Sequence, residues 1–181
     1  MLSPCKVRVM GVSEVKNDET GIHLLMLEEE GGGRKLPIII GGFEAKSILI
    51  ALQKVELKRP IVYDLMLDMM GNYDIELLRV DIVRKSGEAY FSQLITIQDG
   101  HELALDCRTS DAVALAVRCR APIYIEEEIL EEVKDRVQIR HTADAPVSIL
   151  YDYELQDALQ EAIDAENYER AQEIQNRIKN K

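Results

Sequence analysis

The segment at residues 103–125 limits the fold more than any other part of the sequence, because it combines a strand, a helix start and a buried helix. Leucines alternate with small or acidic residues over positions 103–107, as in a strand that turns one face inward. Positions 112–117 are all apolar, which predicts a helix buried on nearly every side. Pro122 ends that helix, and the Ile-Tyr-Ile that follows predicts a return strand.

Charged side chains gather where this strand ends and the helix begins. Asp106, Arg108 and Asp111 lie within six positions of one another. The side-chain oxygens of Thr109, Ser110 and Asp111 are of the kind that caps the exposed N–H groups of a helix start. Loop junctions on a rigid scaffold often carry functional groups. The junction is therefore either a helix cap with a satisfied ion pair or a functional site.

The periodicity of the other segments predicts an α+β fold with a mixed, mainly antiparallel sheet and interspersed helices. Alternating apolar residues predict further strands at residues 5–15, 22–27, 34–40, 75–84 and 89–97. Apolar residues at helical spacing predict helices at residues 42–55, 63–70 and 126–135. Pro37 indicates an edge strand or a bulge. Met66, Met69 and Met70 of the second helix are expected to fill an irregular gap in the core.

The composition changes near residue 150. We expect a main domain at residues 1–137, a linker at 138–151 and a helical αα-hairpin at 152–181, which contains no Gly or Pro. About 30 residues cannot bury a large core, so the narrow apolar face of this hairpin predicts a protein partner.

Composition and charge exclude some classes of protein. The chain has 181 residues, is 46% hydrophobic and 30% charged, and carries a net charge of −11, which disfavours a protein that coats nucleic acid through a broad basic face. No apolar run is long enough to span a bilayer, and the N-terminal segment lacks a secretory pattern. Cys5, Cys107 and Cys119 lack disulfide or metal-ligand spacing, so we expect a cytoplasmic protein with reduced thiols and no membrane contact.

Three blocks in the main domain resemble the bifunctional nuclease family. They are LPIIIGGFEAKSI at 36–48, RPIVYDLM at 59–66 and LDCRTSDAVALAVRCRAPIYI at 105–125. The resemblance covers roughly residues 5–135. The tail, LQDALQEAIDAENYERAQEIQNRI, is similar to the UVR motif, the hairpin through which UvrB meets UvrC in excision repair.

The resemblance implies a compact, often dimeric α+β domain with nuclease activity on DNA and RNA, so we expect a homodimer that takes nucleic acid as substrate. The matching family positions are Glu44, Arg59, Asp64, Asp106, Arg108, Ser110 and Asp111. Two positions depart from the family pattern. Tyr63 stands where the family usually has histidine, and Thr109 stands where it usually has proline. Without the imidazole, the side chain best suited to act as a general base at neutral pH is missing.

The family blocks predict metal-assisted hydrolysis of phosphodiester bonds. In this hypothesis the catalytic carboxylates are also the ligands of Mg²⁺ or Mn²⁺, namely Glu44, Asp64, Asp106 and Asp111. Arg59 and Arg108 would bind phosphate oxygens through their guanidinium groups, and Ser110 would cap or support the helix start. Because a metal-bound hydroxide attacks directly, Tyr63 does not exclude this chemistry.

Two alternatives stay open. In the first, the same charged residues form a buried ion-pair network without catalysis, and the chain is an adaptor whose hairpin at 152–181 recruits a repair or protease partner. Glu44 and Asp64 each lie in the first turn of a predicted helix, where the helix dipole favours an anion without any further role. The second alternative is a small-molecule or nucleotide-binding role. His23, His101 and His141 are scattered and lack ligand spacing.

Overall fold

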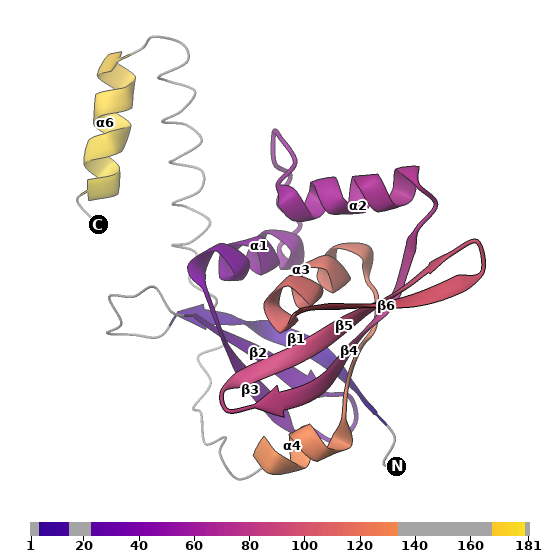
Figure 1. Cartoon of the computed structure of the whole chain (residues 1–181). Helices are drawn as coiled ribbons and strands as arrows, with labels where there is room; N and C mark the ends of the chain where they lie inside the picture. The colour runs from indigo at the N-terminus through magenta and orange to yellow at the C-terminus, as the bar shows by residue number, and fades with distance from the viewer. Residues whose placement is uncertain (1–3, 15–22, 134–167, 180–181) are drawn as a thin grey trace. The chain divides into compact units, whose positions relative to one another are not determined.

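The computed structural model describes residues 4–14, 23–133 and 168–179, and it confirms the predicted α+β class (Figure 1). The chain divides into two compact units, residues 1–145 and 146–181. The first unit contains a seven-stranded sheet in the order β3-β2-β1-β7-β4-β5-β6. Its strands are β1 (Cys5–Glu14), β2 (His23–Glu29), β3 (Lys35–Ile40), β4 (Glu76–Ser86), β5 (Ala89–Gln98), β6 (His101–Arg108) and β7 (Ile123–Ile125).

The sheet is mixed and mainly antiparallel, as the sequence predicted. β1, β2 and β3 pair antiparallel in succession, and β4, β5 and β6 do the same. The short β7 joins the two halves, antiparallel to β1 and parallel to β4. Ile123 pairs with Val7 on one side and with Val80 on the other, and all three side chains are buried. The Ile-Tyr-Ile strand thus lies at the centre of the sheet.

The two edges of the sheet are formed by β3 and β6. β3 forms one edge and contains Pro37, which agrees with the rule that proline in a sheet is confined to edges and bulges. β6 forms the other edge and runs directly into α3 (Thr109–Cys119). The outer backbone groups of β6 pair with no other strand of the described chain. An open edge of this kind is able to pair with a further strand.

Three helices, α1 (Gly42–Leu52), α2 (Val62–Asn72) and α3, lie on one side of the sheet (Figure 1). α3 packs on β4, β5 and β6, and α1 packs on α3, β1 and β2. Residues 112–116 of α3 are buried, as their unbroken apolar run predicted. α2 contacts α3, and the short α4 (Glu127–Val133) lies against β3. This packing brings the N-termini of α1 and α3 to the end of β6.

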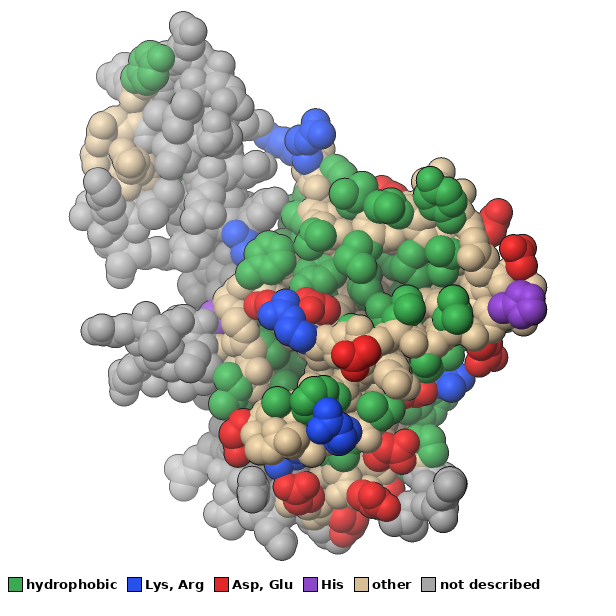
Figure 2. Space-filling model, viewed as in Figure 1, with side chains coloured by type: hydrophobic (Ala, Val, Ile, Leu, Met, Phe, Trp, Pro, Cys, Tyr) green, Lys and Arg blue, Asp and Glu red, His purple; other side chains and the backbone are tan. Residues whose placement is uncertain are grey.

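The prediction that the methionines of α2 fill a core gap is wrong. Tyr63 is the buried residue of this helix, whereas Met66 and Met69 are exposed, Met69 by 54%. The reason is that α2 contacts α3 along one flank, so that its other flank faces outward. Figure 2 shows a broad area of hydrophobic side chains over α2 and beside it. The apolar face consists of Phe43, Val62, Leu65, Met66, Met69, Leu103 and Leu105.

The second unit is described at α6 (Tyr168–Lys179), which confirms the later helix of the predicted hairpin. Ile174 in this helix is buried. The predicted linker at 138–151 and the earlier hairpin helix lie outside the described residues. The two domain boundaries expected from composition, at 137/138 and 151/152, therefore stay a prediction. None of the described helices is both long and apolar enough to cross a membrane.

Candidate functional site

A single guanidinium joins the N-termini of two helices at the end of β6. Arg108 Nη2 lies 2.8 Å from Glu44 Oε1, in the first turn of α1. Arg108 Nε lies 2.8 Å from Asp111 Oδ2, in the first turn of α3. The Arg108 side chain is 68% exposed, while that of Glu44 is only 12% exposed. We call Glu44, Arg108 and Asp111, together with Tyr63, the carboxylate–arginine cluster.

Tyr63 is also a member of this cluster, although the sequence alone identified it only as a position where the family usually has histidine. Its buried hydroxyl donates a hydrogen bond of 2.6 Å to Asp111 Oδ1. Burial raises the pKa of the Tyr63 hydroxyl, and the hydrogen bond to Asp111 and the charges of Asp111 and Glu44 raise it further. Tyr63 therefore stays protonated near neutral pH and orients Asp111, and it does not act as a base. Its position directly before Asp64 in the second family block was the available sequence signal.

The junction between β6 and α3 is held by buried hydroxyl groups. Ser92 Oγ and Thr109 Oγ1 lie 2.6 Å apart within one hydrogen bond. α3 begins at Thr109, two residues earlier than a capping role for Ser110 requires. Arg108 is the N-cap and makes no side-chain cap hydrogen bond, so the prediction that Ser110 caps the helix is wrong. Ser110 is instead buried in the first turn, between Arg108 and Asp111 in the sequence.

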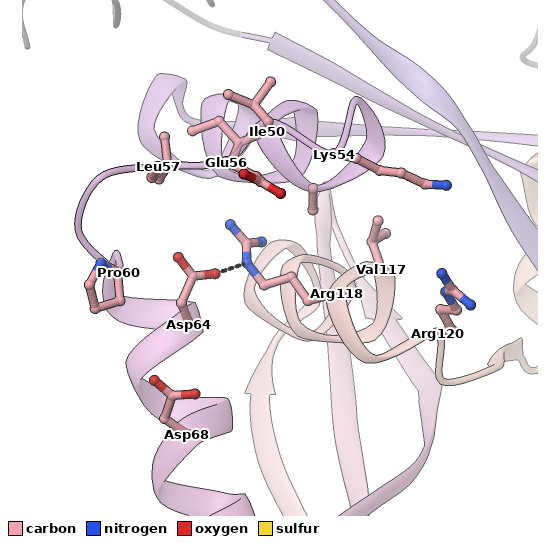
Figure 3. Close-up of a pocket in the computed structure, with 12 residues that line it drawn as sticks. Ile50, Lys54, Glu56, Leu57, Pro60, Asp64, Asp68, Val117, Arg118 and Arg120 are labelled. Atoms are coloured by element: carbon pink, nitrogen blue, oxygen red, sulfur yellow. Dashed lines mark hydrogen bonds and ion pairs between the residues drawn. The ribbon is translucent and has the colours of Figure 1, made fainter.

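Asp64 belongs to a different set of contacts. Its Oδ1 accepts a hydrogen bond of 2.8 Å from Arg118 Nε (Figure 3). Its Oδ2 accepts one of 3.0 Å from the backbone N–H of Ile61. The first bond pairs α2 with α3, and the second caps the start of α2. Arg118 is 7% exposed, and its guanidinium lies 5.2 Å from the centre of the Tyr63 ring. Both oxygens of Asp64 are thus in use.

The structure leaves the two other predicted site residues outside the cluster. Asp106 is exposed on β6, opposite Gln93 in the sheet register, and its side chain forms no hydrogen bond or ion pair with another described residue. Arg59 is exposed in the loop between α1 and α2, and the described part of the chain offers it no ion-pair partner. Neither residue is held in place by a contact of its side chain.

The four predicted metal ligands do not form one compact group in the described chain. Among the described residues, three side chains of types that bind metals do bring their ligand atoms within 4.8 Å of one another. They are Cys5, Glu29 and Glu127. The Arg34 guanidinium lies 2.6 Å from a carboxylate oxygen of each of these glutamates. Burial, with the hydrogen bond to Glu127, raises the pKa of Cys5 to about 11, which leaves a neutral thiol. The positive charge between these two glutamates is thus the guanidinium of Arg34.

Comparison with known proteins places this chain in a family. The family model of the bifunctional nuclease domain matches residues 25–138, which include the whole carboxylate–arginine cluster. This chain belongs to the bifunctional nuclease domain family. The model of the UvrB/UvrC motif matches residues 154–181, at the predicted hairpin.

The relatives of this bifunctional nuclease domain include bacterial and plant proteins. An uncharacterised protein of Mycobacterium tuberculosis is 35% identical over 127 residues, which cover 70% of this chain and 74% of that protein. Bifunctional nuclease 1 of Arabidopsis thaliana is 26% identical over 195 residues, with 91% of this chain and 60% of the plant protein covered. Bifunctional nuclease 1 of Oryza sativa subsp. japonica is 30% identical over 116 residues, with 62% and 35% covered. The chain thus spans less than two thirds of these plant proteins.

Proposed function

We propose that this bifunctional nuclease domain hydrolyses phosphodiester bonds in DNA or RNA at the carboxylate–arginine cluster, with the help of Mg²⁺ or Mn²⁺. The observation that carries the proposal is the convergence of Glu44 and Asp111 on one exposed guanidinium. An exposed arginine is free to turn towards a phosphate, whose oxygens match its fork of N–H donors. Arg59, exposed in the loop before α2, is a second phosphate-binding candidate.

The donor set of the cluster fits a divalent ion of this kind. Glu44 and Asp111 already share one positive charge, and both offer the hard oxygen ligands that Mg²⁺ and Mn²⁺ prefer. A bound ion would activate a water molecule and stabilise the charge on the phosphate. Tyr63 holds one oxygen of Asp111 through its hydroxyl and thereby orients the carboxylate. In this proposal Asp64 has a structural role, and Asp106, two residues before Arg108 on β6 but outside the cluster, would be at most a supplementary ligand.

The test is cleavage of a fluorescent single-stranded oligonucleotide by the full chain, as DNA and as RNA, with Mg²⁺, with Mn²⁺ and with EDTA. We expect cleavage that requires one of the two ions and stops with EDTA. Cleavage that continues unchanged in EDTA would contradict the metal dependence. A protein that cleaves neither substrate with either ion would overturn the nuclease assignment itself.

A second candidate function rests on the match of residues 154–181 to the UvrB/UvrC motif. In this proposal the chain is an adaptor that recruits a repair or protease partner through residues 152–181, with or without nuclease activity. We expect a truncated chain of residues 1–151 to lose a partner that the full chain captures, and to melt at nearly the same temperature as the first unit of the full chain. A truncated chain that still captures the same partner would exclude the hairpin as the binding element.

We also propose that the domain forms a homodimer through the apolar face of α2 and β6. Contiguous exposed apolar areas on soluble proteins usually mark interaction sites, and here the area adjoins the open edge of β6. We expect light scattering to show a dimer at micromolar concentration and Met69→Glu to shift it towards monomer. Lys58→Gln, a charge change in the loop before α2, is the control. A monomeric wild-type chain would refute the dimer.

A further inference from the structure

A cavity of about 620 Å³ lies beside α2, on the side that carries Asp64 and Asp68 (Figure 3). It is bounded by the end of α1, the loop that follows, α2 and the C-terminal end of α3. Its volume is typical of sites for small molecules. Asp64 and Asp68 of α2 point towards it, whereas Glu44, Arg108 and Asp111 are not among its lining residues. The cavity is thus distinct from the carboxylate–arginine cluster.

Arg118 at this cavity has one donor without a partner. Its Nε donates to Asp64 and its Nη1 donates to the carbonyl oxygen of Ala114, 2.8 Å away. Its Nη2 is buried and meets no hydrogen-bond acceptor in the described chain. A buried polar group without a partner is costly and rare in folded proteins, so this donor calls for an acceptor from outside the chain.

The geometry around Asp64 explains why Nη2 is left over. An arginine and a carboxylate usually form two parallel hydrogen bonds, in which Nε and Nη2 each meet one oxygen. Here the second oxygen of Asp64 accepts the backbone N–H of Ile61 at the start of α2. The helix cap therefore uses the acceptor that Nη2 would otherwise take, and Arg118 is among the residues that line the cavity.

Two further cations line the same cavity. Lys54 follows α1 and Arg120 follows α3, and neither forms an ion pair within the described residues. Figure 3 shows both on the side of Val117, away from Asp68. Glu56 and Asp68 are the acidic groups that remain once Asp64 is paired. Lys54 and Arg120 therefore lie on one side of the cavity, and Arg118 lies with the carboxylates on the other. The apolar lining comes from Ile50, Val55, Leu57, Pro60 and Val117.

We propose that this cavity binds a mononucleotide, whose phosphate accepts a hydrogen bond from Arg118 Nη2 and is paired by Lys54 and Arg120. A mononucleotide combines a phosphate dianion, a flat ring for the apolar wall, and hydroxyl and amino donors for Glu56 and Asp68. This site is separate from the proposed nuclease cluster, so it would hold a nucleotide as a regulatory or product ligand. Binding at this site needs no divalent ion.

The experiment is isothermal titration calorimetry on the full chain in EDTA, with AMP, UMP, adenosine and inorganic phosphate as probes. We expect AMP or UMP to bind one per chain, and adenosine to bind at least about tenfold more weakly, since it lacks the charged acceptor. Lys54→Gln and Arg120→Gln should each weaken binding by about five- to tenfold with an unchanged melting temperature. Lys58→Gln, in the same loop but outside the cavity lining, is the control and should bind as the wild type does.

Three outcomes would overturn the proposal. They are no binding of either nucleotide at millimolar concentration, equal affinity for AMP and adenosine, and wild-type affinity in both Lys54→Gln and Arg120→Gln. Inorganic phosphate that binds as tightly as AMP would overturn the assignment to a nucleotide. Arg118→Lys keeps the charge beside Asp64 but lacks Nη2. It should bind AMP as weakly as Lys54→Gln and Arg120→Gln do. Because EDTA prevents turnover, these results are independent of whether the chain is a nuclease.

Discussion

Asp111→Asn is expected to slow metal-dependent cleavage of the oligonucleotide by about 100-fold or more, the usual size of effect when a group that acts on the transition state is lost. The amide keeps an oxygen that can accept the Tyr63 hydroxyl, so the buried tyrosine retains a partner. It lacks the negative charge that attracts Arg108 and that a divalent ion requires. The variant therefore separates the chemistry of the cluster from its contribution to folding.

The stability of Asp111→Asn should change little. Because Arg108 is 68% exposed, loss of its ion pair with residue 111 should cost only about 0.2–1 kcal/mol. Initial cleavage rates and thermal melting of the same preparations measure both effects. Glu128→Gln is the matched control. Like Asp111, Glu128 is an acidic residue in the first turn of a helix, here α4, and its side chain is exposed. Cleavage at the wild-type rate in Asp111→Asn would contradict a role for this carboxylate.

Asp64→Ala is expected to lower the free energy of unfolding by about 3–5 kcal/mol, the typical cost of removing one partner of a buried ion pair. Arg118 is 7% exposed and would keep its charge without the carboxylate that neutralises it. The backbone N–H of Ile61 would also lose its acceptor at the start of α2. Urea unfolding of the full chain, followed by circular dichroism, measures the change.

Two further variants show whether the ion pair causes this loss. Asp68→Ala removes an exposed carboxylate one turn further along α2 and should change stability by no more than about 0.5 kcal/mol. In the double variant Asp64→Ala/Arg118→Met no buried charge is left unpaired, so it should be more stable than Asp64→Ala alone. An Asp64→Ala protein within about 1 kcal/mol of the wild type would show that Arg118 does not depend on this pair.

Much of the fold follows from patterns within short segments. Alternation of apolar residues located β1, β4 and β5 to within a few positions, and the apolar run of α3 correctly indicated its burial. Pro37 correctly indicated an edge strand. These features depend on side chains two to four positions apart, which share a face of a strand or a helix whatever the rest of the chain does.

The predictions that failed concern how elements pack. The spacing of apolar residues in α2 predicted a helix but could not show that Met66 and Met69 lie on its uncovered flank. An apolar stripe looks the same in sequence whether it meets a core or a partner surface. Likewise, Ser110 was expected to cap α3, but the helix begins one residue before it.

By itself, the sequence determined most of the secondary structure, the α+β class, the family and the residue types of the candidate site. Only the tertiary structure decided which charges meet. Tyr63 and Asp111 are 48 positions apart and Asp64 and Arg118 are 54 apart, yet both pairs are in hydrogen-bond contact. The packing of α1 and α2 on α3 places Glu44 and Asp111 on one guanidinium and Asp64 on another. Such partners are set by the positions of whole helices on the sheet, whereas local periodicity reports only which face of each helix is apolar.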